Sequence, residues 1–153
     1  MRAKLILPEM LPQIAALEAE VFHNPWSEQA LSLLVGEGAF GVACTEGDRV
    51  IAYGGMLTVL DEGQITNIAT HPDFRRRGLG SAVVEALLGE ARERGLAFVT
   101  LEVRESNLAA IALYQRFGFE VVGRRPGFYT HPAEAALVMQ KTLSSPLGDA
   151  AGK

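Results

Sequence analysis

The sequence has little of several features that would narrow its class at once. Its 153 residues contain one cysteine, Cys44, which excludes an internal disulfide and favours an inert, buried thiol in a reducing compartment. No apolar run reaches the roughly 20 residues that cross a bilayer, and the N-terminal apolar stretch is too short for a signal peptide. We therefore expect a cytoplasmic protein that does not bind membranes.

Positive charge and metal-ligand patterns are also scarce. The formal net charge is −4 and the isoelectric point is about 5.4. This balance argues against nucleic acid as a partner, because nucleic-acid-binding domains are usually basic. The three histidines, His23, His71 and His131, lack metal-ligand spacing, so we expect no metal. With 48% hydrophobic and 21% charged residues, the composition is typical of one globular domain.

Periodicity and turn residues predict an alternation of short elements. The first half reads as a strand at 4–7, a helix at 9–22, a short helix capped by Ser27 and ending at 35, strands at 41–46 and 49–60, a turn at 61–63 and a strand at 64–70. The second half reads as a helix at 78–94, a strand at 98–103, a helix capped by Ser106 or Asn107 and running to 117, and strands at 120–125 and 135–143.

This order predicts a mixed α/β domain. A helix joins the strands at 64–70 and 98–103, so these two strands should pair in parallel. We expect the domain to cover residues 1–143, followed by a mobile tail at 144–153.

A basic, glycine-containing cluster stands out in this acidic chain. Residues 75–80 read Arg-Arg-Arg-Gly-Leu-Gly, between a predicted strand and a predicted helix. Free N–H groups and the dipole at a helix N-terminus bind phosphate, and glycines let a ligand approach the backbone. A P-loop is excluded because it needs a lysine after its second glycine, where this chain has Ser81. A dinucleotide site needs a third glycine or alanine, where this chain has Val83. The alternative is a solvated basic turn.

A second block, "LEVRESNLAAIALYQRFGF" at 101–119, combines a carboxylate and a tyrosine. Glu102 lies within a predicted central strand, where an unpaired buried charge would be costly. Tyr114 follows twelve positions later, on the next helix. The simpler alternatives are an exposed carboxylate at a strand end and a tyrosine that packs with Ile111 and Phe117.

Together with "NPWSE" at 24–28 and "TNIATHPDFRRRGLG" at 66–80, these blocks resemble the GCN5-related N-acetyltransferases (GNAT). The likeness is strongest to the bacterial ribosomal-protein alanine N-acetyltransferases. It implies a single domain with a mixed, mostly antiparallel sheet splayed around acetyl-CoA and helices on both faces. It also implies an acetyltransferase that acts on a primary amine.

The resemblance further implies roles for individual residues. Glu102 would be the general base and Tyr114 the general acid. The residues implied to bind acetyl-CoA are Ile68, Ala69 and Thr70 at the acetyl group and pantetheine arm, Arg76, Arg77, Gly78, Leu79, Gly80 and Ser81 at the pyrophosphate, and Asn107.

The chemistry needs these types of group. An ammonium has no lone pair, so a base must take its proton before the amine attacks the thioester. Coenzyme A then leaves as a thiolate. A tyrosine has a pKa of about 10 and a thiol one of about 8.5. Full proton transfer from a tyrosine to a thiolate is therefore uphill by roughly 2 kcal/mol. We therefore expect Tyr114 to donate a strong hydrogen bond to the developing thiolate, or to protonate it late in the step.

The acceptor is less well defined. The resemblance favours a protein N-terminus, and Trp26 and the pair Phe128–Tyr129 would border its groove. Ala135 or Ala136 stands where an acidic residue is common in the family, so the acceptor remains open. The alternatives are a small-molecule amine, a lysine, or a coenzyme-A-binding module without turnover. A monomer and a homodimer are both compatible with the sequence.

Overall fold

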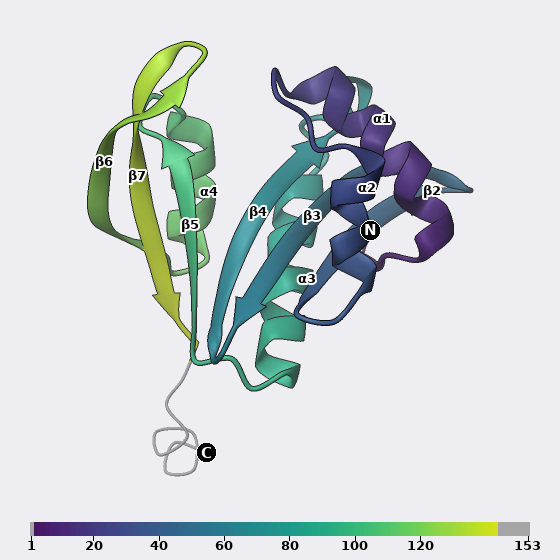
Figure 1. Ribbon diagram of the computed structural model, residues 1–153, viewed down its shortest axis with the longest axis horizontal. Coiled ribbons are helices and arrows are strands. Elements are labelled where there is room, and N and C mark those ends of the chain that lie inside the picture. Colours follow the sequence, from purple (N-terminus) through teal and green to yellow (C-terminus); the bar gives the residue numbers. More distant parts are fainter. Residues whose placement is uncertain (1, 144–153) are drawn as a thin grey trace.

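A single seven-stranded sheet, in the order β1-β2-β3-β4-β5-β7-β6, carries the fold (Figure 1). The computed structural model describes residues 2–143, so the predicted mobile tail at 144–153 lies outside the described residues. The strands are β1 Lys4–Leu5, β2 Ala39–Glu46, β3 Arg49–Val59, β4 Glu62–Thr70, β5 Phe98–Arg104, β6 Glu120–Thr130 and β7 Ala133–Thr142. Neighbouring strands are antiparallel except β4 and β5, which confirms the predicted parallel pair.

Helices cover both faces of this sheet, as expected. In Figure 1, α1 and α2 lie in front of the sheet and α3 and α4 behind it. The α-helices are α1 Leu11–Val21, α2 Glu28–Leu31, α3 Leu79–Glu93 and α4 Leu108–Arg116, and the 3-10 helices are η1 Pro8–Met10, η2 Ser32–Val35 and η3 Pro72–Phe74. None of the helices within residues 2–143 is long and apolar enough to cross a membrane.

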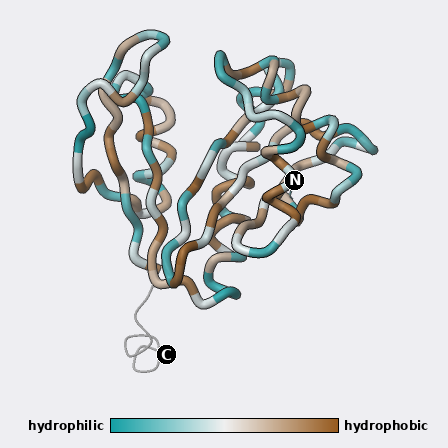
Figure 2. Tube along the Cα trace, in the orientation of Figure 1, coloured by the Kyte–Doolittle hydropathy of each residue, from teal (hydrophilic) through white to brown (hydrophobic). Residues whose placement is uncertain are grey.

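Each face has its own hydrophobic core. On one face, Val83, Val84 and Leu87 of α3 are fully buried against the sheet. On the other face, Ile14 and Leu31 are fully buried. Figure 2 shows apolar residues along the strands and hydrophilic residues at the loop tips. The buried Cys44 belongs to the first core, as expected for an inert thiol, and burial raises its pKa.

Several predicted boundaries need correction. The first strand ends at Leu5, and the predicted helix at 9–22 is η1 followed by α1. The turn predicted at 61–63 is shorter, because Leu60 adopts a left-handed conformation (φ 55°) and β4 already begins at Glu62. The last two strands also differ from the prediction, since β6 runs on to Thr130 and β7 begins at Ala133. Pro126 is tolerated within β6 because this is an edge strand with an irregular register there.

Two predicted helix caps are present. The Ser27 hydroxyl accepts a hydrogen bond from the Ala30 N–H over 3.1 Å, although the helix it begins divides into α2 and η2. Asn107, rather than Ser106, caps α4 by accepting from the Ala110 N–H over 3.2 Å.

The sheet opens where its two parallel strands part. β4 and β5 pair at only three positions, from Glu62–Phe98 to Gln64–Thr100, and then diverge (Figure 1). The register between β3 and β4 also shifts, so that Thr66 and Asn67 both lie opposite Gly55. Such a bulge interrupts the ladder. On its other edge β4 faces β5. Because β5 diverges, this edge of β4 is free of strand pairing beyond Gln64.

Candidate active site

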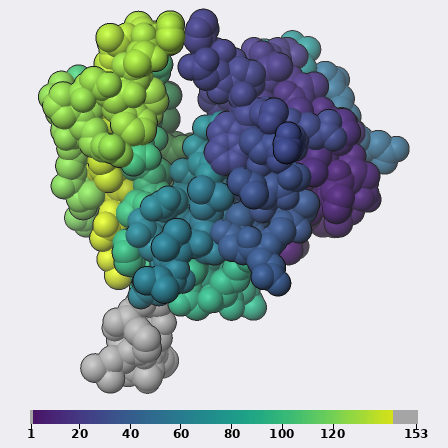
Figure 3. Space-filling view, viewed as in Figure 1, coloured from purple at the N-terminus to yellow at the C-terminus, as the bar shows by residue number. Residues whose placement is uncertain are grey.

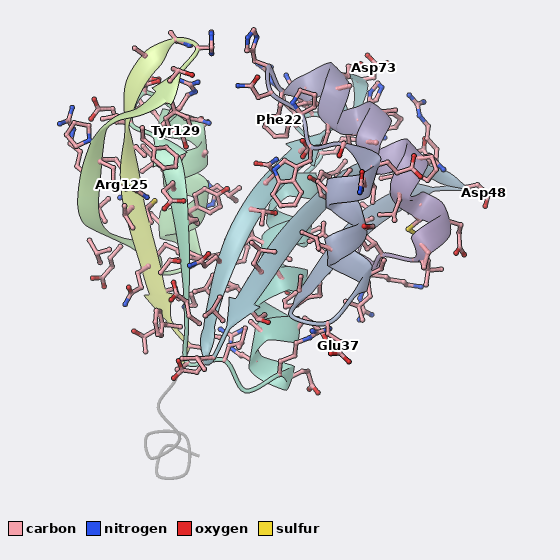
Figure 4. All side chains as sticks on the ribbon, in the orientation of Figure 1. Phe22, Glu37, Asp48, Asp73, Arg125 and Tyr129 are labelled. Atoms are coloured by element: carbon pink, nitrogen blue, oxygen red, sulfur yellow. The ribbon has the colours of Figure 1, made fainter. Side chains whose placement is uncertain are left out.

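The divergence of β4 and β5 creates a cleft of about 950 Å³. Figure 3 shows this hollow between the yellow-green half and the purple-to-blue half of the molecule. One wall comes from the segment after α1 and from β4, and the other from β5, α4, the end of β6 and the turn that follows it. Figure 4 shows Phe22 and Tyr129 on its two sides. A cleft of this size is the usual form of a small-molecule site.

Tyr114 is placed with its ring buried and its hydroxyl open to the cleft. Its side chain packs edge-on against Phe119, with the ring centroids 5.7 Å apart. The residue is 9% exposed and lines the cleft. The Tyr114 hydroxyl forms no hydrogen bond within residues 2–143. Its oxygen is accessible to solvent, since it is not among the buried polar atoms that lack a partner. Burial, and secondarily the nearby Tyr129, raises the pKa of Tyr114 to about 12.

Glu102 lines the same side of the cleft, from β5. It is not the buried carboxylate that its place in a central strand suggested, since 38% of its side chain is exposed. The Arg125 guanidinium of β6 lies 3.4 Å from its Oε2 atom. The divergence of β5 from β4 explains this exposure, because it removes the neighbour that would have covered Glu102.

The opposite wall is the free edge of β4. Ile68, Ala69 and Thr70, the residues expected at the acetyl group and the pantetheine arm, all line the cleft. Thr66, one of the two residues in the bulge, has a buried hydroxyl without a hydrogen-bond partner in residues 2–143. The cleft thus brings Glu102 and Tyr114 to one wall and this unpaired backbone to the other.

The start of α3 has the features of an anion site. Gly78 caps the helix with a left-handed backbone (φ 76°), which suits glycine. The first hydrogen bond of the helix runs from the Ala82 N–H to the Gly78 oxygen, so the three N–H groups before it have no partner within the helix. Gly80 lines the cleft, and a Cβ atom there would lie 3.3 Å from Leu113 of α4.

The three arginines before α3 have different surroundings. Arg75 lines the cleft, although only Arg76 and Arg77 of this cluster were expected to bind acetyl-CoA. Arg77 instead lies over the Phe74 ring at 4.9 Å and 3.7 Å from a Glu46 carboxylate oxygen. Arg76, with a left-handed backbone, does not line the cleft. Gly78, Leu79 and Ser81 also lie beside the cleft rather than in its lining, and Leu79 belongs to the core.

Aromatic and charged residues close the outer end of the cleft. The rings of His23 and His131, from opposite walls, stack with centroids 4.8 Å apart. Arg104 lies 4.2 Å over the Tyr129 ring and pairs with Glu134 at 3.2 Å. Glu134 also accepts the Ser106 N–H, and these two contacts lower the pKa of Glu134. Burial raises the pKa of Tyr129.

Some predicted groove residues are in place. Trp26, Phe128 and Tyr129 all line the cleft, and so does Asn107, which is also the cap of α4. Ala135 and Ala136 are buried in β7, and the carboxylate nearest to them in sequence is Glu134. Residues 2–143 contain no group of three or more histidine, cysteine or acidic residues placed to hold a metal ion.

The comparisons with known proteins agree with this architecture. Residues 11–119 match the Acetyltransferase (GNAT) family. The chain is 38% identical to the [ribosomal protein bS18]-alanine N-acetyltransferase of Escherichia coli (strain K12), over 88% of this chain and 92% of that protein. It is 32% identical to the putative [ribosomal protein bS18]-alanine N-acetyltransferase of Bacillus subtilis (strain 168), over 89% and 91%.

Solved structures show the same likeness. The crystal structure of the ribosomal-protein-S18-alanine N-acetyltransferase from Escherichia coli aligns with a TM-score of 0.86 and 36% identity, over 94% of each chain. Ard1 from Thermoplasma volcanium shares the fold, with a TM-score of 0.80, 22% identity, and 94% and 97% of the two chains covered. The chain therefore belongs to the Acetyltransferase (GNAT) family, whose members are acyltransferases that use acetyl-CoA.

Proposed function

We propose that this chain transfers the acetyl group of acetyl-CoA to the N-terminal α-amine of a protein, such as a ribosomal protein. Residues 1–143 would form the catalytic domain, with Glu102 as general base and Tyr114, on the acid side of the reaction, as hydrogen-bond donor to the leaving thiolate. The observation that carries the proposal is the cleft between β4 and β5, with Glu102 and the Tyr114 hydroxyl along one wall. The relatives that act on ribosomal protein bS18 support the choice of acceptor.

The residues around the cleft fit acetyl-CoA, which supplies the activated acyl group. The free N–H groups at the start of α3 suit the pyrophosphate, and Arg75 adds a positive charge in the cleft. The unpaired edge of β4 at Ile68–Thr70 offers backbone donors and acceptors to the amide groups of the pantetheine arm. The same N–H groups can also stabilise an oxyanion on the thioester carbonyl.

Glu102 suits the role of base because its carboxylate is open to the cleft. It takes the proton of the acceptor ammonium, directly or through one water molecule, and leaves the amine with its lone pair. This first proton then leaves toward solvent, since the side chain is 38% exposed. The second proton, which the nitrogen loses as the tetrahedral intermediate collapses, goes to the departing thiolate or to solvent.

Tyr114 suits the role of hydrogen-bond donor to the leaving sulfur. With a pKa of about 12, its hydroxyl stays protonated throughout the working pH range. A thiol has a pKa of about 8.5, so complete proton transfer to the thiolate is uphill by about 3.5 units, or roughly 5 kcal/mol. The hydroxyl therefore stabilises the thiolate by a hydrogen bond while keeping its proton.

Proton arithmetic favours an α-amine over a lysine. The pKa of an α-amino group is about 7.7–8.0 and that of lysine about 10.4, so lysine is harder to deprotonate near neutral pH by about 3.5 kcal/mol. Trp26 and Tyr129 line the groove and favour a small first residue. The alternatives are a lysine or a small-molecule amine as acceptor, or a module that binds coenzyme A without turnover.

A peptide series with every possible first residue tests the acceptor. With acetyl-CoA present, we expect mass spectrometry to find acetylation at the α-amine, fastest on peptides that begin with alanine. Bulky first residues should react more slowly, because the aromatic side chains narrow the groove. Equal rates for alanine and tryptophan as first residue would contradict the groove assignment. Binding of coenzyme A with no product from any peptide would favour the non-catalytic module.

The phosphate site can be tested separately through binding. Acetyl-CoA should raise the melting temperature of the wild type by mass action. Gly80→Val should lose most of this shift, because its side chain fills the cleft next to Leu113 at the helix start. The matched control is Gly89→Val on the same helix, where a Cβ atom would meet nothing within 4 Å. An unchanged shift in Gly80→Val would show that the pyrophosphate binds elsewhere.

A further inference from the structure

Behind the β4 wall lies a buried carboxylate that the proposed reaction does not use. Glu18 of α1 is 0% exposed and is the one buried charged side chain in residues 2–143. Burying a carboxylate is costly unless donors surround it. No lysine, arginine or histidine within residues 2–143 forms an ion pair with it. Its charge is therefore balanced by hydrogen-bond donors alone.

Three donors converge on this carboxylate. The Trp26 backbone N–H donates to Oε1 over 2.9 Å. Asn67 donates from Nδ2 to Oε2 over 2.8 Å, and the Tyr53 hydroxyl donates to the same oxygen. Burial and the contact with Glu18 raise the pKa of Tyr53 well above its usual range, so this hydroxyl remains a donor. Two of the three donor residues, Trp26 and Asn67, also line the cleft.

Glu18 fixes the orientation of the Asn67 amide. A carboxylate oxygen only accepts hydrogen bonds, so the amide must turn its nitrogen toward Glu18. The amide oxygen of Asn67 accepts no hydrogen bond within residues 2–143. It is also not among the buried polar atoms that lack a partner, so it must be accessible. It is therefore open to solvent, and Asn67 lines the cleft. An oriented carbonyl dipole thus faces the cleft, with a buried negative charge behind it.

We propose that the Asn67 side-chain oxygen accepts a hydrogen bond from the acceptor's α-ammonium group, and that Glu18 is a positioning residue that holds Asn67 in this orientation. The inference rests on the proposed α-amine acceptor. The ammonium would bind between Asn67 on β4 and Glu102 on β5, the two strands that form the cleft. The negative charge of Glu18 favours the cationic form as it enters, and Glu102 then takes the proton.

The Glu18→Gln variant separates this role from a structural one. The side chain keeps its shape. Its oxygen stays with the Trp26 N–H, which is backbone and cannot turn, so its amide nitrogen stands where Oε2 stood and the Tyr53 hydroxyl turns to accept from this nitrogen. Asn67 then has to turn its oxygen toward this nitrogen and its own nitrogen into the cleft, where it repels an ammonium. We expect the KM for a peptide with a free N-terminus to rise about 10- to 100-fold, since a hydrogen bond to a charged group is lost. The KM for acetyl-CoA should stay unchanged.

A second change should restore binding. In Glu18→Gln/Asn67→Asp, the new amide nitrogen at position 18 donates to one oxygen of the new carboxylate at position 67 and leaves the other oxygen facing the cleft. We expect the peptide KM of this double variant to return to within about threefold of wild type. The single variant Asn67→Asp places two carboxylates side by side and should therefore melt at a lower temperature than wild type. This rescue distinguishes orientation from packing, because a purely structural Glu18 would change the melting temperature without this pattern in KM.

The assay uses the full chain, acetyl-CoA and one peptide with a free N-terminal alanine. Wild type is measured first, and a failure to acetylate the α-amine would overturn both this inference and the proposed function. If wild type acetylates the peptide but Glu18→Gln leaves its KM unchanged, the proposed function stands and the role of Glu18 and Asn67 is wrong. A raised KM that the double variant does not restore would also overturn the orientation of Asn67.

Discussion

Replacing Tyr114 by phenylalanine should lower kcat about 100-fold, the lower end of the range for loss of one hydrogen-bond donor to a developing anion. The thiolate then leaves without its hydrogen-bond donor. The hydroxyl opens on the cleft and forms no hydrogen bond within residues 2–143. Its removal should therefore leave the melting temperature and the Kd for acetyl-CoA almost unchanged, as calorimetry can verify.

The pH dependence of this defect provides a second check. Because burial raises the pKa of Tyr114 to about 12, the group stays protonated below that pH. The ratio of wild-type to Tyr114→Phe turnover should therefore be constant between about pH 6 and pH 10. A ratio that falls toward one near pH 10 would mean that the hydroxyl ionises early and that the raised pKa is wrong. A ratio of one at all pH values would remove Tyr114 from the chemistry.

Replacing Glu102 by glutamine should also lower kcat about 100-fold, but only near neutral pH. The acceptor amine is then an ammonium, and the variant has no base to remove its proton. Above the amine pKa of about 7.7–8.0 the substrate is already neutral, so the defect should shrink by pH 9. Tyr114 is still protonated there, so its contribution stays constant over this range. Steady-state rates at several pH values measure the effect.

The chain offers a matched control for Glu102. Glu105 pairs with Arg124 at 2.8 Å, as Glu102 pairs with the next residue of β6, Arg125, at 3.4 Å. Glu105 does not line the cleft. Glu105→Gln removes the same charge and should keep wild-type turnover. If both variants lost activity equally, the loss would reflect the charge of this surface rather than a base.

The sequence was informative wherever local rules determine structure. Capping rules predicted Ser27 and left Ser106 or Asn107 for α4, of which Asn107 is the cap. The helix between β4 and β5 predicted their parallel pairing. The fold class and family were also predicted correctly. The end of β6 was predicted too early. Pro126 and Gly127 indicate the end of a strand unless that strand is known to lie at the edge of the sheet.

The missed residues depend on contacts between distant segments. Glu18 meets Asn67, 49 positions away, and no local pattern predicts that contact. One signal was present, because Glu18 shares the helical face of Ile14 at a spacing of four residues, which indicates burial. The three consecutive arginines look alike in sequence, and only the fold shows that Arg75 lines the cleft while Arg77 packs on Phe74.

The central claim is transfer of an acetyl group to a protein α-amine, and one pair of peptides tests it most directly. Both have the same sequence. One has a free N-terminus and blocked lysines, and the other has a blocked N-terminus and free lysines. Thiol release from acetyl-CoA, with mass spectrometry of the product, should show much faster acetylation of the first peptide near neutral pH. Faster acetylation of the second would contradict the claim and make this chain a lysine acetyltransferase.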